Sequence, residues 1–521
     1  MYLTQSLHRA VQQKPEHIAV RFGPRQRTFR EFADRVARLA GALQRLGMRE
    51  GDRVAMLALN SDRYLEYQMA VPWGGGVLNP CNTRWSAAEI LYALNDSGST
   101  ILLVDETFRP LVESIRRDAT TLREIIHCGE DEGARPGGLH DYEALLAEAE
   151  PVPDAVRRGE DLAGIFYTGG TTGFPKGVML SHDNLCSSGL TLRAEGMATP
   201  GGVYLHAAPM FHLADIGIAI PHWMEGNTHA VVPAFSPELV LDTLARDRVT
   251  HLLLVPTMIQ MLVDHPSMRQ PRDLSALKGI IYGASPISEA VLERAMAALP
   301  GVDFAQAYGM TELSPLATLL PPLHHRPEAR VLGKQRSAGR ASFCTEVRVV
   351  DPDDRELPRG AVGEVIVRGP NVMQGYWNKP AETAAALRGG WMHTGDGGYM
   401  DEDGFVFIVD RMKDMIISGG ENIYSAEVEN ALAQHPGVAA CAVIGIPSPE
   451  WGEAVHAVVI RKAGASTSAD ELAAHCKTLI AGYKCPRSIE FREALPLSGA
   501  GKVLKTELRK PFWQSQERQV H

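Results

Sequence analysis

The sequence of 521 residues lacks the marks of a secreted, membrane-spanning or nucleic-acid-binding protein. Its seven cysteines, an odd number with no CxxC pair, predict neither a disulfide framework nor a zinc site. No apolar run approaches the ~18 residues of a membrane span, and the start, MYLTQSLHRAVQQKPEH, lacks the basic-then-apolar order of a signal peptide. The net charge of −10 gives no basis for nucleic-acid binding, which needs an excess of Lys and Arg. We therefore expect a cytoplasmic protein with no transmembrane segment and no nucleic-acid partner.

Strand-like and helix-like segments alternate up to about residue 340. Apolar residues recur at helical spacing over 30–48, where Gly47 ends the pattern, and the run 52–59 is typical of a strand. Helix, turn and strand follow in YLEYQMAVPWGGGVLNP, and further strands are predicted in TILLVD, AGIFYT, GVMLSH, THLLLVP and GIIYGAS. This alternation predicts an α/β fold with parallel sheets and helices on both of their faces.

The pattern changes after residue 340. Short strands joined by Asp-Pro and Gly turns, as in TEVRVVDPDDRELPRGAVGEVIVRG, predict a small antiparallel, β-barrel-like part, with a further hairpin that turns at Asp403-Gly404. The last 110 or so residues read as a small α+β unit, and the glycine-rich VDRMKDMIISGGENI is the predicted boundary. We expect a large N-terminal domain over 1–412 and a C-terminal domain over 413–521.

A glycine-rich loop with a single charge, YTGGTTGFPKGVML, covers residues 167–180. It is not a Walker A loop, because Phe174 and Pro175 separate Gly173 from Lys176 and because a strand, not a helix, is predicted to follow it. Glycines allow backbone N–H groups to turn toward an anion, Thr hydroxyls add donors, and Lys176 adds a point charge. The loop therefore predicts phosphate binding of another kind.

Four more motifs follow in order, and together the five resemble the adenylate-forming superfamily, which includes acyl-CoA synthetases, beetle luciferases and peptide-synthetase adenylation domains. In that family QAYGMTE (306–312) corresponds to the adenine and Mg²⁺ motif and HTGDGGYMDEDG (393–404) to the ribose motif. DRMKDMIISGGENI (410–423) corresponds to the hinge and thiol-tunnel motif, and LSGAGKV (497–503) to the catalytic lysine loop. The resemblance covers essentially the whole chain and implies an ATP-dependent enzyme.

The resemblance implies a site for ATP and Mg²⁺. Lys176 would hold the β- and γ-phosphates, Glu312 and Thr171 would bind Mg²⁺, and Thr311 would donate to the α-phosphate. Many members have Ser where this chain has Gly169, so one hydroxyl donor is missing. The other residues that the resemblance assigns to the nucleotide are Thr168, Gly169, Gly170, Thr172 and Gly173 for the phosphates, Gly283, Ala284, Ser285, Tyr308 and Gly309 for the adenine, and Asp396 and Arg411 for the ribose.

The resemblance also implies two half-reactions and a mobile C-terminal domain. Lys502 would reach the α-phosphate and the substrate carboxylate while acyl-AMP and pyrophosphate form. The small domain would then swing about a hinge near Lys413 and present a face with Ser418, Gly419 and Gly420 to coenzyme A, whose thiol expels AMP. His212, in PMFHLAD, would line the entry of the acyl carboxylate. Homodimers are common in the family, so a homodimer is an open alternative to a monomer.

Each assigned residue also has a plainer interpretation. Without the motifs, Lys176 reads as a solvated surface lysine, Tyr308 as a core aromatic and Asp396 as a turn residue. Glu312 reads as a helix start, and His212 as a satisfied buried histidine. At the level of the whole chain, a nucleotide-binding protein with an inactive site and a luciferase-like oxygenase remain as alternatives.

The identity of the acid is the least determined point. Amino-acid-activating members commonly have Asp directly after the position of His212, where this chain has Leu213, so an amino acid is not expected. The apolar stretch MFHLADIGIAI (210–220) suits a fatty or an aryl acid, and each buried CH₂ would contribute ~0.8 kcal/mol. We expect a medium- or long-chain fatty acid, with a benzoate- or cinnamate-type acid as the alternative and coenzyme A as the thiol.

Overall fold

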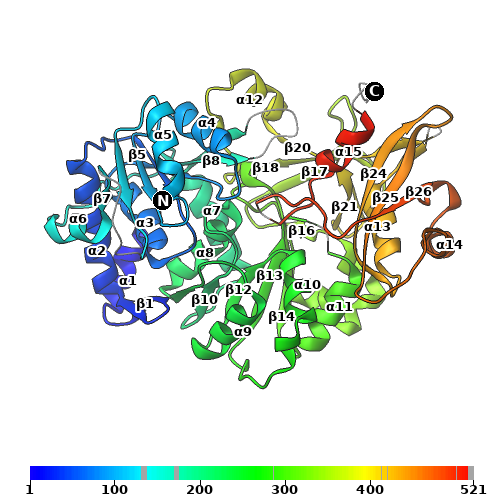
Figure 1. Cartoon of the computed structure of the whole chain (residues 1–521), viewed down its shortest axis with the longest axis horizontal. Helices are drawn as coiled ribbons and strands as arrows, with labels where there is room; N and C mark the ends of the chain where they lie inside the picture. The colour runs from blue at the N-terminus through cyan, green and yellow to red at the C-terminus, as the bar shows by residue number, and fades with distance from the viewer. Residues whose placement is uncertain are drawn as a thin grey trace.

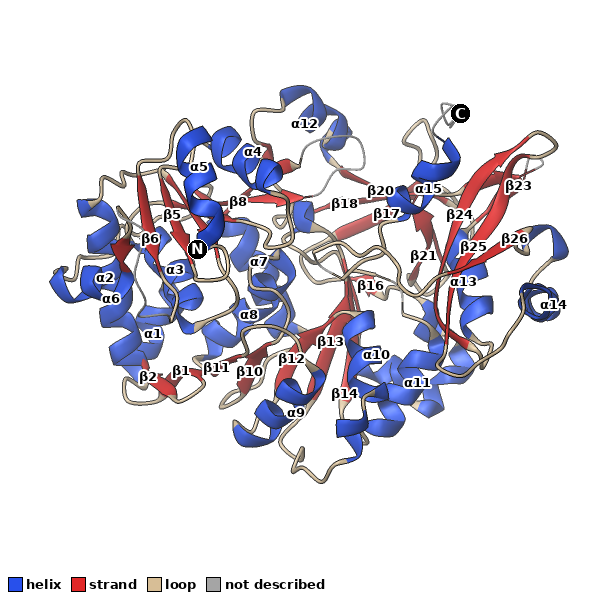
Figure 2. Ribbon diagram, viewed as in Figure 1, coloured by secondary structure: helices blue, strands red, loops and turns tan. Residues whose placement is uncertain are grey.

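The computed structural model describes residues 1–130, 138–168, 175–285, 287–411, 414–418, 421–499 and 501–513, apart from the side chains of residues 327 and 330. Within these ranges the strands form four sheets. Figures 1 and 2 show two large sheets with their helices, then a region of antiparallel strands, and then β24, β25 and β26 at the end of the molecule far from the N-terminus. This is the predicted α/β architecture, with a large N-terminal domain of mixed sheets and a smaller C-terminal domain.

The first large sheet is formed mainly by strands from the middle of the chain. Its strand order in the described residues is β16 (Arg340–Ala341), β15 (Thr318–Leu320), β14 (Asp303–Tyr308), β13 (Gly279–Gly283), β12 (His251–Leu254), β10 (Val203–His206), β11 (Thr228–Val231), β1 (Ile18–Phe22) and β2 (Arg25–Thr28). The run from β14 to β1 is parallel, and β2, β15 and β16 pair antiparallel at the two edges.

The second large sheet carries the glycine loop. Its order, over the residues that the structure describes, is β19 (Gly375–Tyr376), β9 (Lys176–Ser181), β8 (Leu162–Thr168), β4 (Val77–Pro80), β3 (Arg53–Leu57), β5 (Ile101–Val104), β6 (Glu124–His127) and β7 (His140–Asp141). The prediction of parallel strands is wrong for AGIFYT and GVMLSH, because β8 and β9 pair antiparallel. Only seven residues separate β8 from β9, and a crossover between parallel strands needs about a dozen or more.

Helices cover both large sheets and share a layer between them. Side chains of α1 (Gln5–Gln13), α2 (Phe29–Arg45), α3 (Asp62–Trp73) and α8 (Leu213–Glu225) form one hydrophobic core with strands of both sheets. The outer face of the first sheet packs on α9 (Pro237–Arg246), α10 (Pro256–Asp264) and α11 (Glu289–Ala298), and the outer face of the second sheet on α4 (Ala87–Ser97) and α5 (Val112–Asp118). The other α-helices that the structure describes in the N-terminal domain are α6 (Tyr142–Glu148), α7 (His182–Ala194) and α12 (Pro380–Ala386).

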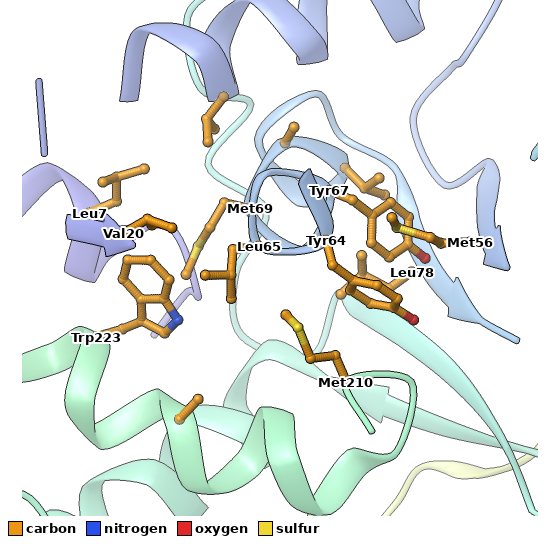
Figure 3. Close-up of a cluster of buried hydrophobic side chains, with 14 of the residues drawn as sticks. Leu7, Val20, Met56, Tyr64, Leu65, Tyr67, Met69, Leu78, Met210 and Trp223 are labelled. Carbon is orange, nitrogen blue, oxygen red and sulfur yellow. The ribbon is translucent and has the colours of Figure 1, made fainter. Parts of the chain in front are cut away.

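Helix α3 lies at the centre of the shared layer and is buried on every side. Figure 3 looks along this helix, and Tyr64, Leu65, Tyr67 and Met69 point from it in different directions into apolar surroundings. A helix without a solvent face must also bury its charged residues, which therefore need partners. Among the described helices, none is both long and apolar enough to cross a membrane.

The antiparallel part and the C-terminal domain follow in sequence. The order β17 (Glu346–Val350), β18 (Gly363–Arg368), β20 (Met392–Met400) and β21 (Val406–Arg411) is antiparallel throughout, as predicted. The hairpin between β20 and β21 is longer than a two-residue turn, since five residues, 401–405, connect the strands. The C-terminal sheet contains β23 (Glu421–Ile423), β22 (Ile416–Ser418), β25 (Gly452–Arg461), β24 (Val438–Ser448) and β26 (Ser488–Phe491), and its helices are α13 (Ser425–Ala433), α14 (Ala469–Leu479) and α15 (Lys505–Trp513).

Candidate active site

The residues predicted to bind adenine lie at the carboxyl ends of two neighbouring parallel strands. Gly283 pairs with Ala307 across β13 and β14, so the segments 283–285 and 308–309 leave the sheet side by side. Glycine is required at Gly283, because a Cβ there would lie 2.2 Å from the carbonyl oxygen of Ala307. Ala284 has a left-handed φ of +66°, which turns the chain away from the strand. Ligands of open α/β sheets bind at this edge.

Asp396 connects the predicted adenine and ribose residues. Its Oδ2 accepts a hydrogen bond of 2.8 Å from the Tyr308 hydroxyl, and its Oδ1 lies 3.0 Å from Nε of Arg411. Asp396 is buried, and it pairs with Arg411 across β20 and β21. A carboxylate held in this way can accept hydrogen bonds from a diol at the strand edge.

Glu312 and Lys176 meet at a third side chain, Tyr376. Glu312 lies in a short 3-10 turn, Thr311–Leu313, directly after β14, and its buried Oε1 accepts a hydrogen bond of 2.8 Å from the Tyr376 hydroxyl. Burial raises the pKa of Glu312, while Tyr376, Arg411 and Lys176 act in the opposite direction. Lys176 begins β9, and its Nζ lies 4.9 Å from the centroid of the Tyr376 ring. Tyr376 was not predicted as a site residue, although the aromatic pair in GYW was a signal for it.

His212 has a structural role at the start of α8. It is the N-cap residue of this helix, and its Nδ1 accepts a hydrogen bond of 3.2 Å from the backbone N–H of Ala214. Burial lowers the pKa of His212 to about 4; Asp215 acts against this shift and Lys502 adds to it. The neutral imidazole therefore lies within electrostatic reach of the predicted catalytic lysine.

Lys502 is placed by a short hairpin of the C-terminal domain that packs against the N-terminal domain. The hairpin is closed by the bridge between Leu497 and Val503 and by hydrogen bonds between Ser498 and Lys502. The carbonyl of Ser498 accepts a bond of 2.9 Å from Arg84, and that of Gly501 accepts a bond of 3.4 Å from Thr257. Arg84 and Thr257 thus hold the lysine loop against the N-terminal domain.

The electrostatic surroundings of Lys502 bring the predicted residues together. Its side chain is reached by solvent, but the protein atoms around it, followed by the Arg411 guanidinium, lower the pKa of the ammonium group to about 8. Asp396 acts in the opposite direction. Lys502 therefore lies within electrostatic range of Arg411, Asp396 and His212.

A polar network joins the two domains where the sheets change. Asp410, near the end of β21, accepts hydrogen bonds from the backbone N–H and the hydroxyl of Ser425, at 2.7 and 2.6 Å. Lys505 donates to the Ser425 hydroxyl and forms an ion pair of 2.8 Å with Glu429. These contacts fix the position of α13 and α15 relative to β21, and none of these residues was predicted.

Two predicted residues lie at strand ends, next to segments that the structure does not describe. Thr168 ends β8 and Ser418 ends β22. Other predicted residues lie outside the described residues, and they are Gly169, Gly170, Thr171, Thr172, Gly173, Lys413, Gly419 and Gly420.

Comparison with known proteins gives the family. The family described as AMP-binding enzyme matches residues 7–377, and the AMP-binding enzyme C-terminal domain matches residues 427–502. The chain belongs to the AMP-binding enzyme family. This confirms the resemblance found in the motifs.

Two relatives and one solved structure match this AMP-binding enzyme over nearly its whole length. It is 42% identical over 505 residues, 97% of its chain and 98% of the other, to the feruloyl-CoA synthase of an Amycolatopsis species. It is 37% identical over 522 residues, 99% and 97% of the two chains, to the fatty acid–[acyl-carrier-protein] ligase ScoC of Streptomyces coeruleorubidus. The structure of ATP-bound MatB from Rhodopseudomonas palustris matches with a TM-score of 0.87 and 32% identity, over 98% of this chain and 99% of that one. The AMP-binding enzyme is thus an acid–thiol ligase with the fold of the adenylate-forming superfamily.

Proposed function

We propose that this enzyme joins a carboxylic acid to coenzyme A at the expense of ATP, through an acyl-adenylate. The position of Lys502 is the main support, because its loop contacts the N-terminal domain and its ammonium group lies within electrostatic range of Asp396 and Arg411. Such a cation can neutralise charge while a carboxylate approaches the α-phosphate, which is the difficulty of this reaction. Release of pyrophosphate completes the first step.

The other residues of the site bind and orient in the first step. Asp396 accepts from the ribose hydroxyls, Tyr308 flanks the adenine, and Lys176 meets the outer phosphates. Glu312 fits a Mg²⁺ ion, because a single buried carboxylate suits a cation that takes its other ligands from phosphate and water. The ion, when bound, supplies charge neutralisation at the phosphates.

The second step would need the small domain to turn. β21 ends at Arg411 and β22 begins at Ile416, so the chain passes from one sheet to the next within a few residues. This short passage supports the proposed boundary after residue 412 and a hinge at Lys413. The turn would withdraw Lys502 and bring the segment after Ser418 to the acyl-adenylate, where the thiol forms the thioester and AMP leaves.

The lowered pKa of Lys502 predicts an alkaline limit to the first step. The ammonium group loses its charge as the pH rises through about 8 in the free enzyme, and bound triphosphate should move this midpoint upward. We expect the single-turnover rate of acyl-adenylate formation, at saturating ATP and acid, to fall as the pH rises above this midpoint, which gives the pH profile an alkaline limb. Lys502→Arg should stay charged over the whole range and lack the limb, even if it is slower. The same limb in the Arg variant would assign it to another group.

Helix α8, which begins after His212, contributes two rings to a buried, stacked layer. On α8, Asp215, Ala219 and His222 share the face toward the first sheet. His222 stacks on Tyr204 at a centroid distance of 4.6 Å, and Trp223 stacks on His229 at 3.7 Å, all four rings being buried. This layer begins about 15 Å along the helix from His212, at ~1.5 Å per residue.

We infer that the acid is an aryl acid of the cinnamate type, with a medium- or long-chain fatty acid as the second candidate. A long alkyl chain that entered at His212 and ran along α8 would meet the buried ring layer, and moving close-packed rings is costly. The higher identity to a feruloyl-CoA synthase favours the same order. This order reverses the one predicted from the sequence. The similarity to ScoC keeps the fatty acid as a candidate.

An acid panel tests the proposal. We would measure pyrophosphate release with ATP, Mg²⁺ and coenzyme A for ferulate, cinnamate, benzoate and saturated acids from C6 to C16, each also without coenzyme A. Turnover with ring acids, and loss of turnover above the medium chain lengths, is expected. Activity that grows with alkyl length would establish the fatty acid instead. Absence of pyrophosphate release with every acid would contradict the ligase itself.

A further inference from the structure

One segment of the second sheet is built around the turn that carries Glu312. The amide of Asn371 donates to the carbonyls of Leu313 and Leu316, at 2.9 and 2.6 Å, and the backbone N–H of Met373 donates to the carbonyl of Glu312 at 2.9 Å. Asn371 is fully buried. The segment 371–377 therefore fixes the backbone of this turn.

The same segment places Tyr376 between two charged groups. β19 pairs with β9 so that Tyr376 lies opposite Val178, and the backbone N–H of Trp377 donates to Gly177 at 2.7 Å. Lys176 is two residues from Val178 on β9 and hence on the same face. The Tyr376 hydroxyl donates to Glu312 at 2.8 Å, and the Lys176 ammonium group lies 4.9 Å from the ring centroid. The buried Tyr376 side chain thus contacts Glu312 through its hydroxyl and Lys176 through its ring.

We propose that Tyr376 is a positioning residue, which aims the Glu312 carboxylate at the metal and holds Lys176 at the triphosphate site before the nucleotide arrives. The inference rests on the proposed function, since that function assigns Glu312 to Mg²⁺ and Lys176 to the phosphates. The hydroxyl binds Oε1 and so fixes the orientation of the carboxylate. The ring attracts the ammonium group by a contact weak enough to be exchanged for phosphate oxygens.

The two parts of the side chain can be removed separately. Tyr376→Phe removes the hydroxyl and keeps the ring, so it should disturb Glu312 alone. Tyr376→Leu removes both, so it should also disturb Lys176. Tyr2→Phe is the matched control, because Tyr2 is a half-buried tyrosine near His8 and lies outside every motif of the site.

Equilibrium binding tests the inference without catalysis. We would titrate wild type and variants with ATP by calorimetry, once with Mg²⁺ and once with EDTA, and check each fold by circular dichroism. Tyr376→Phe should weaken Mg²⁺·ATP binding by about 10-fold or more, as expected for a lost hydrogen bond to a charged group, and leave metal-free ATP binding within about 2-fold. Tyr376→Leu should weaken both, and Tyr2→Phe neither.

Each result separates the inference from the proposed function. Wild-type affinity for Mg²⁺·ATP in Tyr376→Phe, or an equal loss with and without metal, would overturn the inference. If Tyr376→Leu fails to fold, the Phe variant decides alone. The expected binding pattern in an enzyme that activates no acid would uphold the inference and reject the ligase. Wild type that binds no ATP would reject both.

Discussion

Replacing Lys502 with alanine should slow acyl-adenylate formation on the order of 10³-fold, while thioester formation from supplied acyl-adenylate stays within a few-fold of wild type. The lysine loop contacts the N-terminal domain in the conformation described here, where Lys502 lies near Asp396 and Arg411. Its charge is needed while two anions approach each other. It is not needed when a thiol attacks an acyl-adenylate that already exists.

The two half-reactions can be measured separately in the same preparation. Pyrophosphate release reports the first, and AMP release from synthetic acyl-adenylate with coenzyme A reports the second. Lys477→Ala, on an exposed side chain of α14 in the same domain, is the matched control and should leave both unchanged. An equal loss of both halves in Lys502→Ala would remove the specific role assigned to this lysine.

The order of the elements was predictable because it depends on local pattern. The helix predicted over 30–48 is α2, and the strand predicted over 52–59 is β3. The nucleotide residues were found through motifs that follow strand ends, where parallel strands bring distant segments together. Thr311, Glu312 and Tyr308 belong to one such motif, so the resemblance identified them without knowledge of their contacts.

The contacts between motifs were not predictable, because they depend on how the sheets associate. Tyr376 reaches Glu312 across 64 residues of sequence, and Tyr308 reaches Asp396 across 88. Both separations are far longer than any one helix or strand, so the periodicity within an element does not connect these residues. The direction of β9 was also missed, since a run of apolar residues does not show which way a strand is paired.

The partner of a buried charge is also a contact between distant segments, which the sequence does not predict. The loss of one such partner should have the largest effect on stability. Helix α3 is buried all round, yet it carries Glu66, whose side chain is 1% exposed. Arg35 of α2 holds it with two bonds, 2.6 and 3.1 Å long, and also bonds Glu143. The Tyr142 hydroxyl adds a bond of 2.6 Å. Burial raises the pKa of Glu66, and Arg35 counteracts this rise.

Arg35→Met should lower the local free energy of unfolding around α2 and α3 by about 3–5 kcal/mol, because it leaves a buried carboxylate without its cation. Arg30→Met is the matched control on the same helix. Arg30 pairs with Glu16, and the two side chains are 63% and 72% exposed, so its loss should cost less than about 1 kcal/mol. Hydrogen exchange of peptides within 29–73 measures the local value, which suits a protein of two domains better than a single unfolding midpoint.

The pH dependence of this deficit identifies its cause. Without Arg35 the pKa of Glu66 in the folded protein should rise further, so the folded state takes up a proton that the unfolded state releases. Stability of the variant then falls as the pH rises from the unfolded pKa toward the folded one, and it is flat above. The deficit relative to wild type should therefore be smaller at about pH 5 than at about pH 8. A deficit that does not change with pH would mean that lost packing of the arginine stem, and not the unpaired charge, destabilises the variant.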